Sequence, residues 1–288
     1  MYVFTSIEIW KSIVSAKNRD INDLYNNFLK DKDSGKFVDI HCHCLPGLDD
    51  GPKTMDEAIM LCRMFVDEGI TVSVATSHQL GRYEYCNEAE AVREAVYNLN
   101  KMLKQRNIAV TIVPGGEVRV DERICQLLKE DKILTIADGG KYILIELPHE
   151  IFIDIEPLLK ELFAMDIRAI ISHVERQPFL IKKQDILQRW LEYSACLQIT
   201  ASSIMGCFGI DARKAAWDYL KSGLAGVIAT DSHDSNTRKP YMKAAYQIIQ
   251  KELGENIAHS VCIENPLRIL HGRDIIPASI FSHEEILR

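Results

Sequence analysis

The sequence has little of what would direct a protein to a membrane, a nucleic acid or an oxidising compartment. No apolar run approaches the roughly 18 residues that cross a bilayer, and residues 1–10 lack the basic stretch and continuous apolar run of a secretory signal. Lys and Arg total 34 against 41 Asp and Glu, so there is no basic excess for binding nucleic acid. The 8 cysteines show no paired spacing, which favours free thiols in a reducing compartment. We therefore expect a cytoplasmic protein that neither inserts into a membrane nor binds nucleic acid.

Long linkers, internal repeats and low-complexity stretches are also lacking, which indicates one globular domain with an N-terminal extension. Of the 288 residues, 47% are hydrophobic, enough for a sizeable core. Before residue 37, apolar side chains fall at helical spacing over residues 7–14 and again over 21–29. We predict an N-terminal amphipathic helical extension over residues 1–36 and a catalytic domain over residues 37–288. The extension is expected to pack on the domain surface, and docking of a partner is the alternative.

From residue 37 onward, short β-rich runs alternate with helical stretches. The runs are nearly continuously apolar, as in parallel strands that are covered on both faces. The predicted strands are residues 37–41, 70–76, 108–113, 142–147, 168–172, 196–200 and 226–230. Thr54 and Glu57 form a capping box at the start of the first helix of this domain. Further helices are predicted at residues 88–105, 154–165, 184–193, 211–221 and 240–253. About seven βα units favour a closed α/β barrel over an open sheet.

Imidazole and carboxylate side chains follow most of the predicted strands. Because the carboxyl ends of barrel strands converge on one face, these side chains are expected to share one basin. They are His41, His43, His78, Glu117, Glu146, His173, Asp231 and His233. Asp49 and Asp50 follow the first strand closely enough for one of them to join. Isolated histidines such as His149 and His259 are interpreted as surface or core residues.

The spacing within the His-x-His and Asp-x-His pairs has a geometric meaning. Alternate residues of an extended strand share a face, so His41 lies beside His43 and Asp231 beside His233. Cys42 then points the other way and is assigned to packing. Imidazoles mixed with carboxylates, without thiolates, suit Mn, Fe, Zn or Mg. The set is too large for one ion, so we expect two or three divalent ions bridged by a carboxylate, for which Glu146 is favoured. Such clusters hold a hydroxide for phosphoryl transfer, which indicates a metal-dependent phosphoesterase.

Several short motifs, in order along the chain, resemble those of one known superfamily. They are His41-Cys42-His43, the loop of residues 45–51 (LPGLDDG), residues 75–78 (ATSH), Gly116-Glu117, Ile145-Glu146, residues 172–176 (SHVER) and residues 230–233 (TDSH). This series is similar to the polymerase and histidinol phosphatase (PHP) superfamily. The loop and the His-Val-Glu-Arg segment further resemble the bacterial capsule-operon tyrosine phosphatases of the CpsB/YwqE type. The resemblance runs from about residue 37 to residue 275 and leaves out the N-terminal extension.

The resemblance implies a distorted (β/α)7 TIM-like barrel, the PHP fold, with a trinuclear site that often holds manganese. It also implies hydrolysis of phosphotyrosine, in particular on the tail of an autophosphorylating bacterial tyrosine kinase that controls capsule and exopolysaccharide synthesis. Arg176 and Arg238 would bind the phosphate, because guanidinium groups match phosphate oxygens bidentately. Carried over by position, the metal ligands would be His41, His43, Asp50, His78, Glu117, Glu146, His173, Asp231 and His233.

Three alternatives compete with a metal-dependent tyrosine phosphatase. Cys207 and Arg213 have the Cys-x5-Arg spacing of thiolate-based phosphatases, but Asp211 between them would repel a phosphate, and the loop lacks the small residues of a phosphate cradle. A phosphatase of the same superfamily that acts on a small molecule, such as histidinol phosphate, is the second alternative. The third is a non-catalytic regulator that binds a kinase, which the full ligand set argues against.

Overall fold

The computed structural model of the chain describes residues 37–277. The predicted helical extension over residues 1–36 lies outside the described residues and stays a prediction. Within the described range, no helix is long and apolar enough to cross a bilayer.

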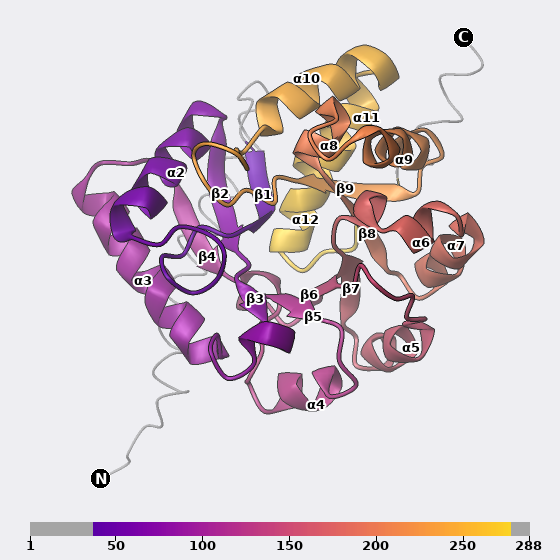
Figure 1. Ribbon diagram of the computed structural model, residues 1–288, viewed down its shortest axis with the longest axis horizontal. Coiled ribbons are helices and arrows are strands. Elements are labelled where there is room, and N and C mark those ends of the chain that lie inside the picture. Colours follow the sequence, from indigo (N-terminus) through magenta and orange to yellow (C-terminus); the bar gives the residue numbers. More distant parts are fainter. Residues whose placement is uncertain (1–36, 278–288) are drawn as a thin grey trace. The chain divides into compact units, whose positions relative to one another are not determined.

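The described strands pair in parallel throughout and form two sheets (Figure 1). The first sheet has the order β1 (Phe37–Cys42), β2 (Ile70–Ala75), β4 (Thr111–Pro114). The second has the order β3 (His78–Gln79), β5 (Glu117–Arg119), β6 (Tyr142–Glu146), β7 (Arg168–Ile171), β8 (Cys196–Thr200), β9 (Ala225–Ala229). The prediction of an α/β fold with parallel strands is confirmed.

Backbone hydrogen bonds join the two sheets at two places. On one side, Glu117 N–H at the start of β5 donates to the carbonyl of Thr76, which follows β2 (3.2 Å). On the other side, Asp231 N–H donates to the His41 carbonyl (2.8 Å), and Cys42 forms an isolated parallel bridge with Ser232. The carboxyl ends of β1, β2, β4 and β9 therefore meet at one place.

Two of the strands were missed by the sequence pattern, β3 and β5. Each follows a longer strand after a bend, β3 after β2 and β5 after β4. Gly115 lies in the second bend, where an added Cβ would lie 2.6 Å from Cγ1 of Val74. This close approach of the backbone to β2 requires glycine. The bends move His78 and Glu117 away from the line of β2 and β4 and onto the second sheet.

Helices surround the strands (Figure 1). The longer ones are α2 (Met55–Asp67), α3 (Ala89–Gln105), α5 (Glu156–Ala164), α7 (Gln184–Glu192), α9 (Ile210–Lys221) and α10 (Met242–Leu253). Each of these except α2, for which only the start was predicted, begins and ends within about two residues of its predicted bounds. The shorter ones are α4 (Ile124–Lys129), α6 (Pro178–Ile181), α8 (Ala201–Met205), α11 (Glu255–His259) and α12 (Asn265–Leu270), with single turns η1 (Gly81–Tyr83), η2 (Ile136–Asp138), η3 (Val174–Arg176) and the π-type η4 (Ser260–Glu264). Thr54 caps α2 as predicted, because its hydroxyl accepts from Glu57 N–H at 3.3 Å.

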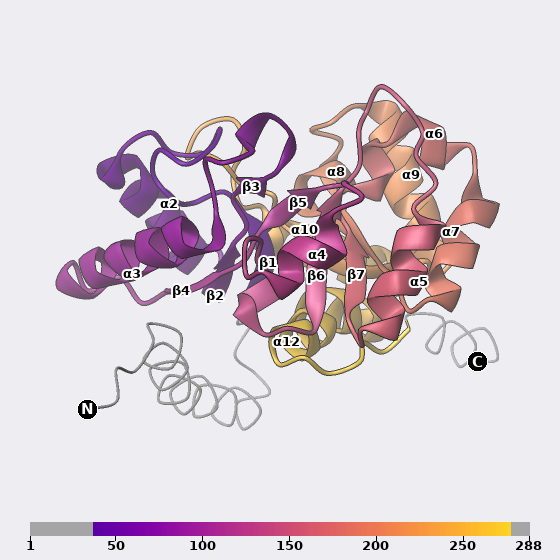
Figure 2. The same ribbon diagram turned by 90° about the horizontal axis from the view of Figure 1, so that it is seen from below.

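The packing of the core determines which end of the strands is open to functional side chains. Every residue of β1, β8 and β9 is buried, and α3 buries the stripe Ala89, Val92, Val96, Leu99 and Leu103. At the end of the strands opposite β3 and β5, α12 packs against β1 and β9 (Figure 2). Functional side chains therefore gather at the carboxyl ends of the strands.

Candidate metal centre

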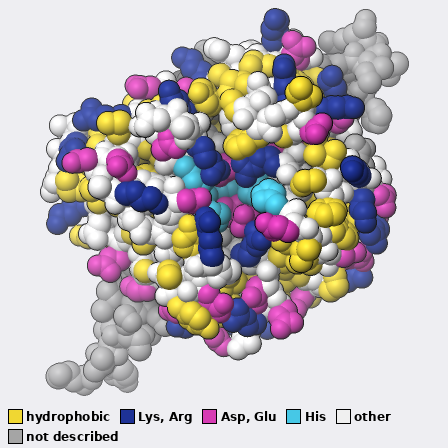
Figure 3. All heavy atoms as spheres, viewed as in Figure 1, with side chains coloured by type: hydrophobic (Ala, Val, Ile, Leu, Met, Phe, Trp, Pro, Cys, Tyr) yellow, Lys and Arg dark blue, Asp and Glu magenta, His cyan; other side chains and the backbone are white. Residues whose placement is uncertain are grey.

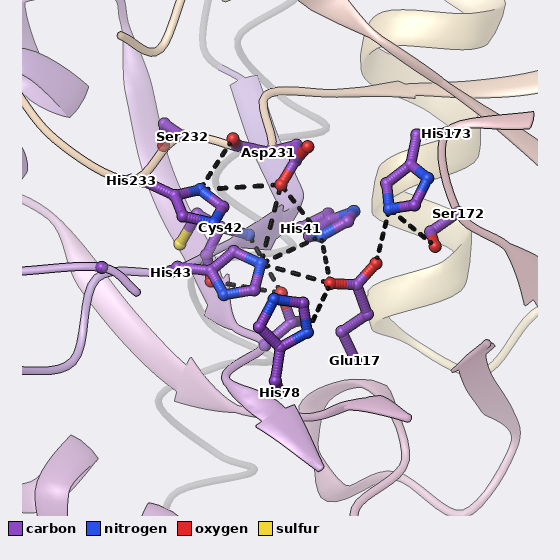
Figure 4. Close-up of polar contacts among 12 residues, drawn as sticks. His41, Cys42, His43, His78, Glu117, Ser172, His173, Asp231, Ser232 and His233 are labelled. Carbon is purple, nitrogen blue, oxygen red and sulfur yellow. Dashed lines mark hydrogen bonds and ion pairs between the residues drawn. The ribbon is translucent and has the colours of Figure 1, made fainter. Parts of the chain in front are cut away.

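The structure brings all the predicted ligand residues together at the carboxyl ends of the strands. Figure 4 shows most of them pointing toward one another. Three sets of possible ligand atoms each lie within 4.8 Å of one another: His41, His43 and Asp231; His78, Glu117 and Glu146; and His43, Asp50, His78 and His233. His173 joins them through Glu117, because its Nε2 lies 2.9 Å from the Oε1 atom of that carboxylate.

The innermost atoms belong to His41, His43, Glu117 and Asp231, whose side chains are at most 1% exposed. The two Nε2 atoms of His41 and His43 are 3.3 Å apart. Oε2 of Glu117 lies 3.4 Å from the first and 3.3 Å from the second. Oδ1 of Asp231 lies 3.4 Å from the first and 3.6 Å from the second. Two imidazole nitrogens and two carboxylate oxygens therefore face one point, an arrangement that suits a divalent cation.

The charges in this cluster compensate one another. Burial alone would raise the pKa of Glu117 and of Asp231, but the neighbouring histidines, and for Asp231 also Arg176 and Arg238, hold both pKa values well below the usual range. Burial alone would lower the pKa of His43, but the carboxylates of Asp49 and Glu117 raise it well above the usual value. Nδ1 of His173 is buried without a hydrogen-bond partner. The donor set fits bound divalent cations, which would compensate the buried carboxylates in place of imidazolium.

Glu117 lies at the centre of the cluster, the position that the sequence suggested for Glu146. Besides the contacts above, Oε2 of Glu117 lies 3.2 Å from Nδ1 of His78. Glu146 approaches the same nitrogen at 3.7 Å, is 15% exposed, and pairs with Arg119 at 3.3 Å. Glu117 thus faces four histidines, whereas Glu146 reaches only the edge of the cluster.

Asp49 and Asp50, between which the pattern could not choose, have different positions. Oδ1 of Asp50 lies 3.4 Å from Nε2 of His78 and 3.3 Å from Nε2 of His233, so Asp50 faces the cluster directly. Oδ2 of Asp49 lies 2.8 Å from Nδ1 of His43 and accepts a hydrogen bond from His78 N–H at 3.0 Å. Asp49 therefore orients the ring of His43 from behind.

We expect Asp49→Asn to weaken metal binding and metal-dependent activity by about 10- to 100-fold, the usual effect of losing a carboxylate that orients a ligating histidine. The amide preserves the shape but removes the charge that stabilises His43. Titration of the metal-depleted protein with Mn²⁺, followed by activity, measures the effect. Full activity restored at high Mn²⁺ is the expected signature, whereas unchanged Mn²⁺ affinity would contradict the orienting role.

Two of the predicted ligand residues have strained backbones. His173 (φ 35°) and Asp231 (φ 50°) adopt the left-handed conformation, each two residues after the end of its strand, β7 and β9 respectively. Such conformations of non-glycine residues are costly and are common at functional sites. Here they turn the two side chains toward the cluster at the point where each strand ends.

Two arginines lie beside the cluster at the positions that the motifs indicate. Arg176, in η3, places Nη1 2.8 Å from Oδ2 of Asp231. Arg238 places Nη2 2.5 Å from the same oxygen and Nη1 2.8 Å from Nε2 of His233. Both Nε atoms are buried without a hydrogen-bond partner. The two guanidinium groups thus converge on one side of the cluster and line the cleft into which it opens.

The cluster opens into a cleft of about 420 Å³. Asp50, His78, Glu117, Glu146, His173, Asp231, His233 and both arginines line it, together with Tyr83, Arg119 and His149. Figure 3 shows histidine side chains at the base of a hollow whose rim carries Lys and Arg. A small anionic group fits this combination of size and charge.

Several residues of the site were missed by sequence reasoning. Gln198, on β8, places Oε1 3.0 Å from Nδ1 of His41 and accepts from His173 N–H at 3.0 Å. Asp39 accepts from Thr230 N–H at 2.9 Å, and burial raises its pKa to about 6 despite these bonds to Thr230. Gln198 could have been recognised as a polar residue inside an otherwise apolar strand. Asp39 could have been recognised because it stands two residues before His41 and therefore shares its face of the strand.

His149 is exposed, in agreement with its interpretation as a surface residue, but it also lies next to the cluster. Its ring lies 6.0 Å from that of His173 in a stacked arrangement, and it lines the cleft. No spacing signal marks it, because it stands alone in a loop after β6. Cys207 is exposed on the turn before α9, and neither it nor Arg213 is among the residues that line the described cleft.

Comparisons with known proteins identify relatives of this chain. A family model described as capsular polysaccharide synthesis, CpsB/CapC, matches residues 37–271. The tyrosine-protein phosphatase YwqE of Bacillus subtilis (strain 168) is 32% identical over 244 residues, which cover 83% of this chain and 93% of YwqE. The putative tyrosine-protein phosphatase CapC of Staphylococcus aureus is 36% identical over 207 residues, covering 72% of this chain and 80% of CapC.

Solved structures show the same likeness. A chain from the crystal structures of YwqE from Bacillus subtilis and CpsB from Streptococcus pneumoniae, described as unique metal-dependent tyrosine phosphatases, superposes with a TM-score of 0.78 at 30% identity. The match covers 83% of this chain and 96% of that one. The phosphotriesterase homology protein from Escherichia coli has a TM-score of 0.52 at 10% identity, over 82% of this chain and 99% of that one. At this low identity the match shows a similar fold and nothing more.

Proposed function

The chain belongs to the CpsB/CapC family of capsular polysaccharide synthesis proteins, and from this we propose that it is a metal-dependent protein-tyrosine phosphatase. The observation that carries the proposal is the convergence of buried histidines and carboxylates beside two arginines in one cleft. Relatives that are named tyrosine-protein phosphatases, similar over most of this chain, support the substrate class.

We propose that the site holds two or three divalent ions, with manganese first and Fe, Zn or Mg as alternatives. The residues that would hold them are His41, His43, Asp50, His78, Glu117, Glu146, His173, Asp231 and His233. When bound, such ions lower the pKa of water to supply the nucleophile and neutralise phosphoryl oxygens. Their total charge would also offset the carboxylates that line the cleft.

The residues of the chain perform the remaining steps. Arg176 and Arg238 bind the phosphoryl oxygens and stabilise the charge that develops on them, because their donors are already held in place by Asp231. The cleft walls orient the ester so that the leaving tyrosinate points outward. Tyrosine has a pKa of about 10, so its anion leaves with modest need for a general acid.

We further propose the setting of this activity. The substrate is a phosphotyrosyl protein, in particular an autophosphorylating bacterial tyrosine kinase of capsule or exopolysaccharide synthesis, as the family description suggests. A cytoplasmic location is supported by the free state of all 8 cysteines. The two sheets would form a single distorted (β/α)7 barrel, a proposal supported by the bonds that join the start of β5 to the end of β2 and the end of β9 to β1.

Turnover of a phosphotyrosyl peptide and of histidinol phosphate by the Mn²⁺-loaded protein separates the proposed function from its alternatives. We expect kcat/KM to favour the peptide by at least about a hundredfold, since a site built for one substrate discriminates by several kcal/mol. A preference for histidinol phosphate would identify a small-molecule phosphatase. Absence of turnover on both, in protein that binds a kinase tail, would identify a non-catalytic regulator.

A further inference from the structure

A second cavity of about 670 Å³ adjoins the metal cleft. The two share His149, Arg176 and Arg238 as lining residues, so they form one continuous depression. In the proposed catalysis, Arg176 acts from the side that faces Asp231. Its other side faces the second cavity and has no role in that step.

Phe208 is the main aromatic residue of this second cavity. The guanidinium carbon of Arg176 lies 4.4 Å from the centre of its ring, and the side chain is 37% exposed. Phe208 stands on the turn between α8 and α9, where Gly206 (φ +89°) and Gly209 (φ +92°) adopt conformations that favour glycine. This turn places one face of the ring on Arg176 and leaves the remainder open to the cavity.

The lining of the cavity combines apolar and charged side chains. Pro178, Ile181, Ala212 and Phe208 are its apolar residues, and Lys182 and Asp211 add one charge of each sign. Figure 3 shows hydrophobic side chains on the α6 side of the central hollow. Apolar pockets with an aromatic residue and a few charges are typical of peptide recognition.

The floor of the cavity is held in place by Glu175. Its Oε1 accepts from Thr200 N–H at 3.1 Å and from the Ser203 hydroxyl at 2.6 Å, which ties η3 to the start of α8. Since Glu175 and Arg176 are adjacent in η3, the same bonds hold Arg176 between the cleft and the cavity. The pocket is therefore formed before a ligand arrives, which lowers the entropic cost of binding.

We propose that this cavity is a recognition subsite for a large apolar side chain of the substrate that flanks the phosphotyrosine, with Phe208 as its main contact. The inference rests on the proposed phosphatase function. The cleft of about 420 Å³ accommodates the phosphate and its ring, while the larger cavity lies beyond Arg176, where the next residue of a peptide would pass. The activity would thus depend on the sequence around phosphotyrosine as well as on the phosphate.

Two phosphotyrosyl peptides that differ in their flanking residues, phenylalanine in one and glycine in the other, test the subsite. For the Mn²⁺-loaded wild type we expect kcat/KM to favour the phenylalanine peptide by about tenfold or more, mainly through KM. In Phe208→Ala this ratio should fall to within about twofold of one, and Phe208→Leu should give an intermediate ratio. The ratio remains informative even where loss of the contact with Arg176 lowers turnover of both peptides.

Phe163→Ala is the matched control. Phe163 is 44% exposed on α5, and the guanidinium carbon of Arg168 lies 4.6 Å from its ring, so the same kind of contact is removed outside the site. This variant should keep the wild-type ratio. A wild-type ratio near one, or a ratio unchanged in Phe208→Ala, would overturn the subsite while leaving the phosphatase function intact. No turnover of either peptide by the wild type would overturn the proposed function and the subsite with it.

Discussion

Replacing Asp231 by asparagine is expected to lower kcat/KM for a phosphotyrosyl peptide by about a thousandfold, equivalent to about 4 kcal/mol of transition-state stabilisation. One carboxylate oxygen of Asp231 faces His41 and His43, and the other binds Arg176 and Arg238. Asparagine has nearly the same shape but no charge. The substitution therefore weakens the metal ligand set and the anchoring of both arginines in one step.

Steady-state kinetics and elemental analysis of the same Mn²⁺-reconstituted sample measure this effect. We expect fewer ions per chain in Asp231→Asn than in the wild type, with a folded protein by circular dichroism. Asp67→Asn, which removes an exposed carboxylate at the end of α2, is the control and should stay within about twofold of wild type. Near-normal activity with a full metal complement in Asp231→Asn would show that this carboxylate is not needed for metal binding or catalysis.

Replacing Arg176 by alanine is expected to lower kcat/KM by about a hundredfold while the metal content stays unchanged. Arg176 touches Asp231 and Phe208 but is not among the groups of possible ligand atoms. Its loss removes a donor to the phosphoryl oxygens. Arg176→Lys should recover part of the activity, because an ammonium group supplies the charge without the bidentate geometry.

Inhibition by inorganic phosphate separates phosphate binding by Arg176 from a structural role. We expect phosphate to inhibit Arg176→Ala less strongly than the wild type at equal metal content. Arg189→Ala is the control, since Arg189 is 47% exposed and pairs with Glu156 on the protein surface. If Arg176→Ala lost metal together with activity, its role would lie in holding Asp231 and not in binding phosphate.

The longer elements and the membership of the site were predictable from the sequence. β8 was predicted with its observed bounds, and the strand ends that carry His41, His43, Asp231 and His233 could be recognised from alternate spacing. These predictions worked because the strands are buried on both faces, so that apolar runs mark them and polar residues mark their ends.

The distribution of roles within the site was less predictable. Sequence spacing shows which strand end carries a carboxylate, but not how far it reaches, so Glu146 was preferred to Glu117 as the bridging residue. The bends after β2 and β4 bring Glu117 to the centre of the cluster, which the spacing of the strands does not indicate. The contribution of Gln198 and His149 comes from packing between distant segments, which local patterns do not encode.

One measurement tests the central claim most directly: the metal content of the purified protein determined beside its activity on a phosphotyrosyl peptide, before and after chelation. We expect two or three divalent ions per chain, loss of turnover when they are removed, and recovery of turnover with Mn²⁺. We expect turnover by Cys207→Ser to equal that of the wild type. Full turnover by the metal-free protein, abolished by Cys207→Ser, would contradict the claim and indicate a covalent thiolate mechanism.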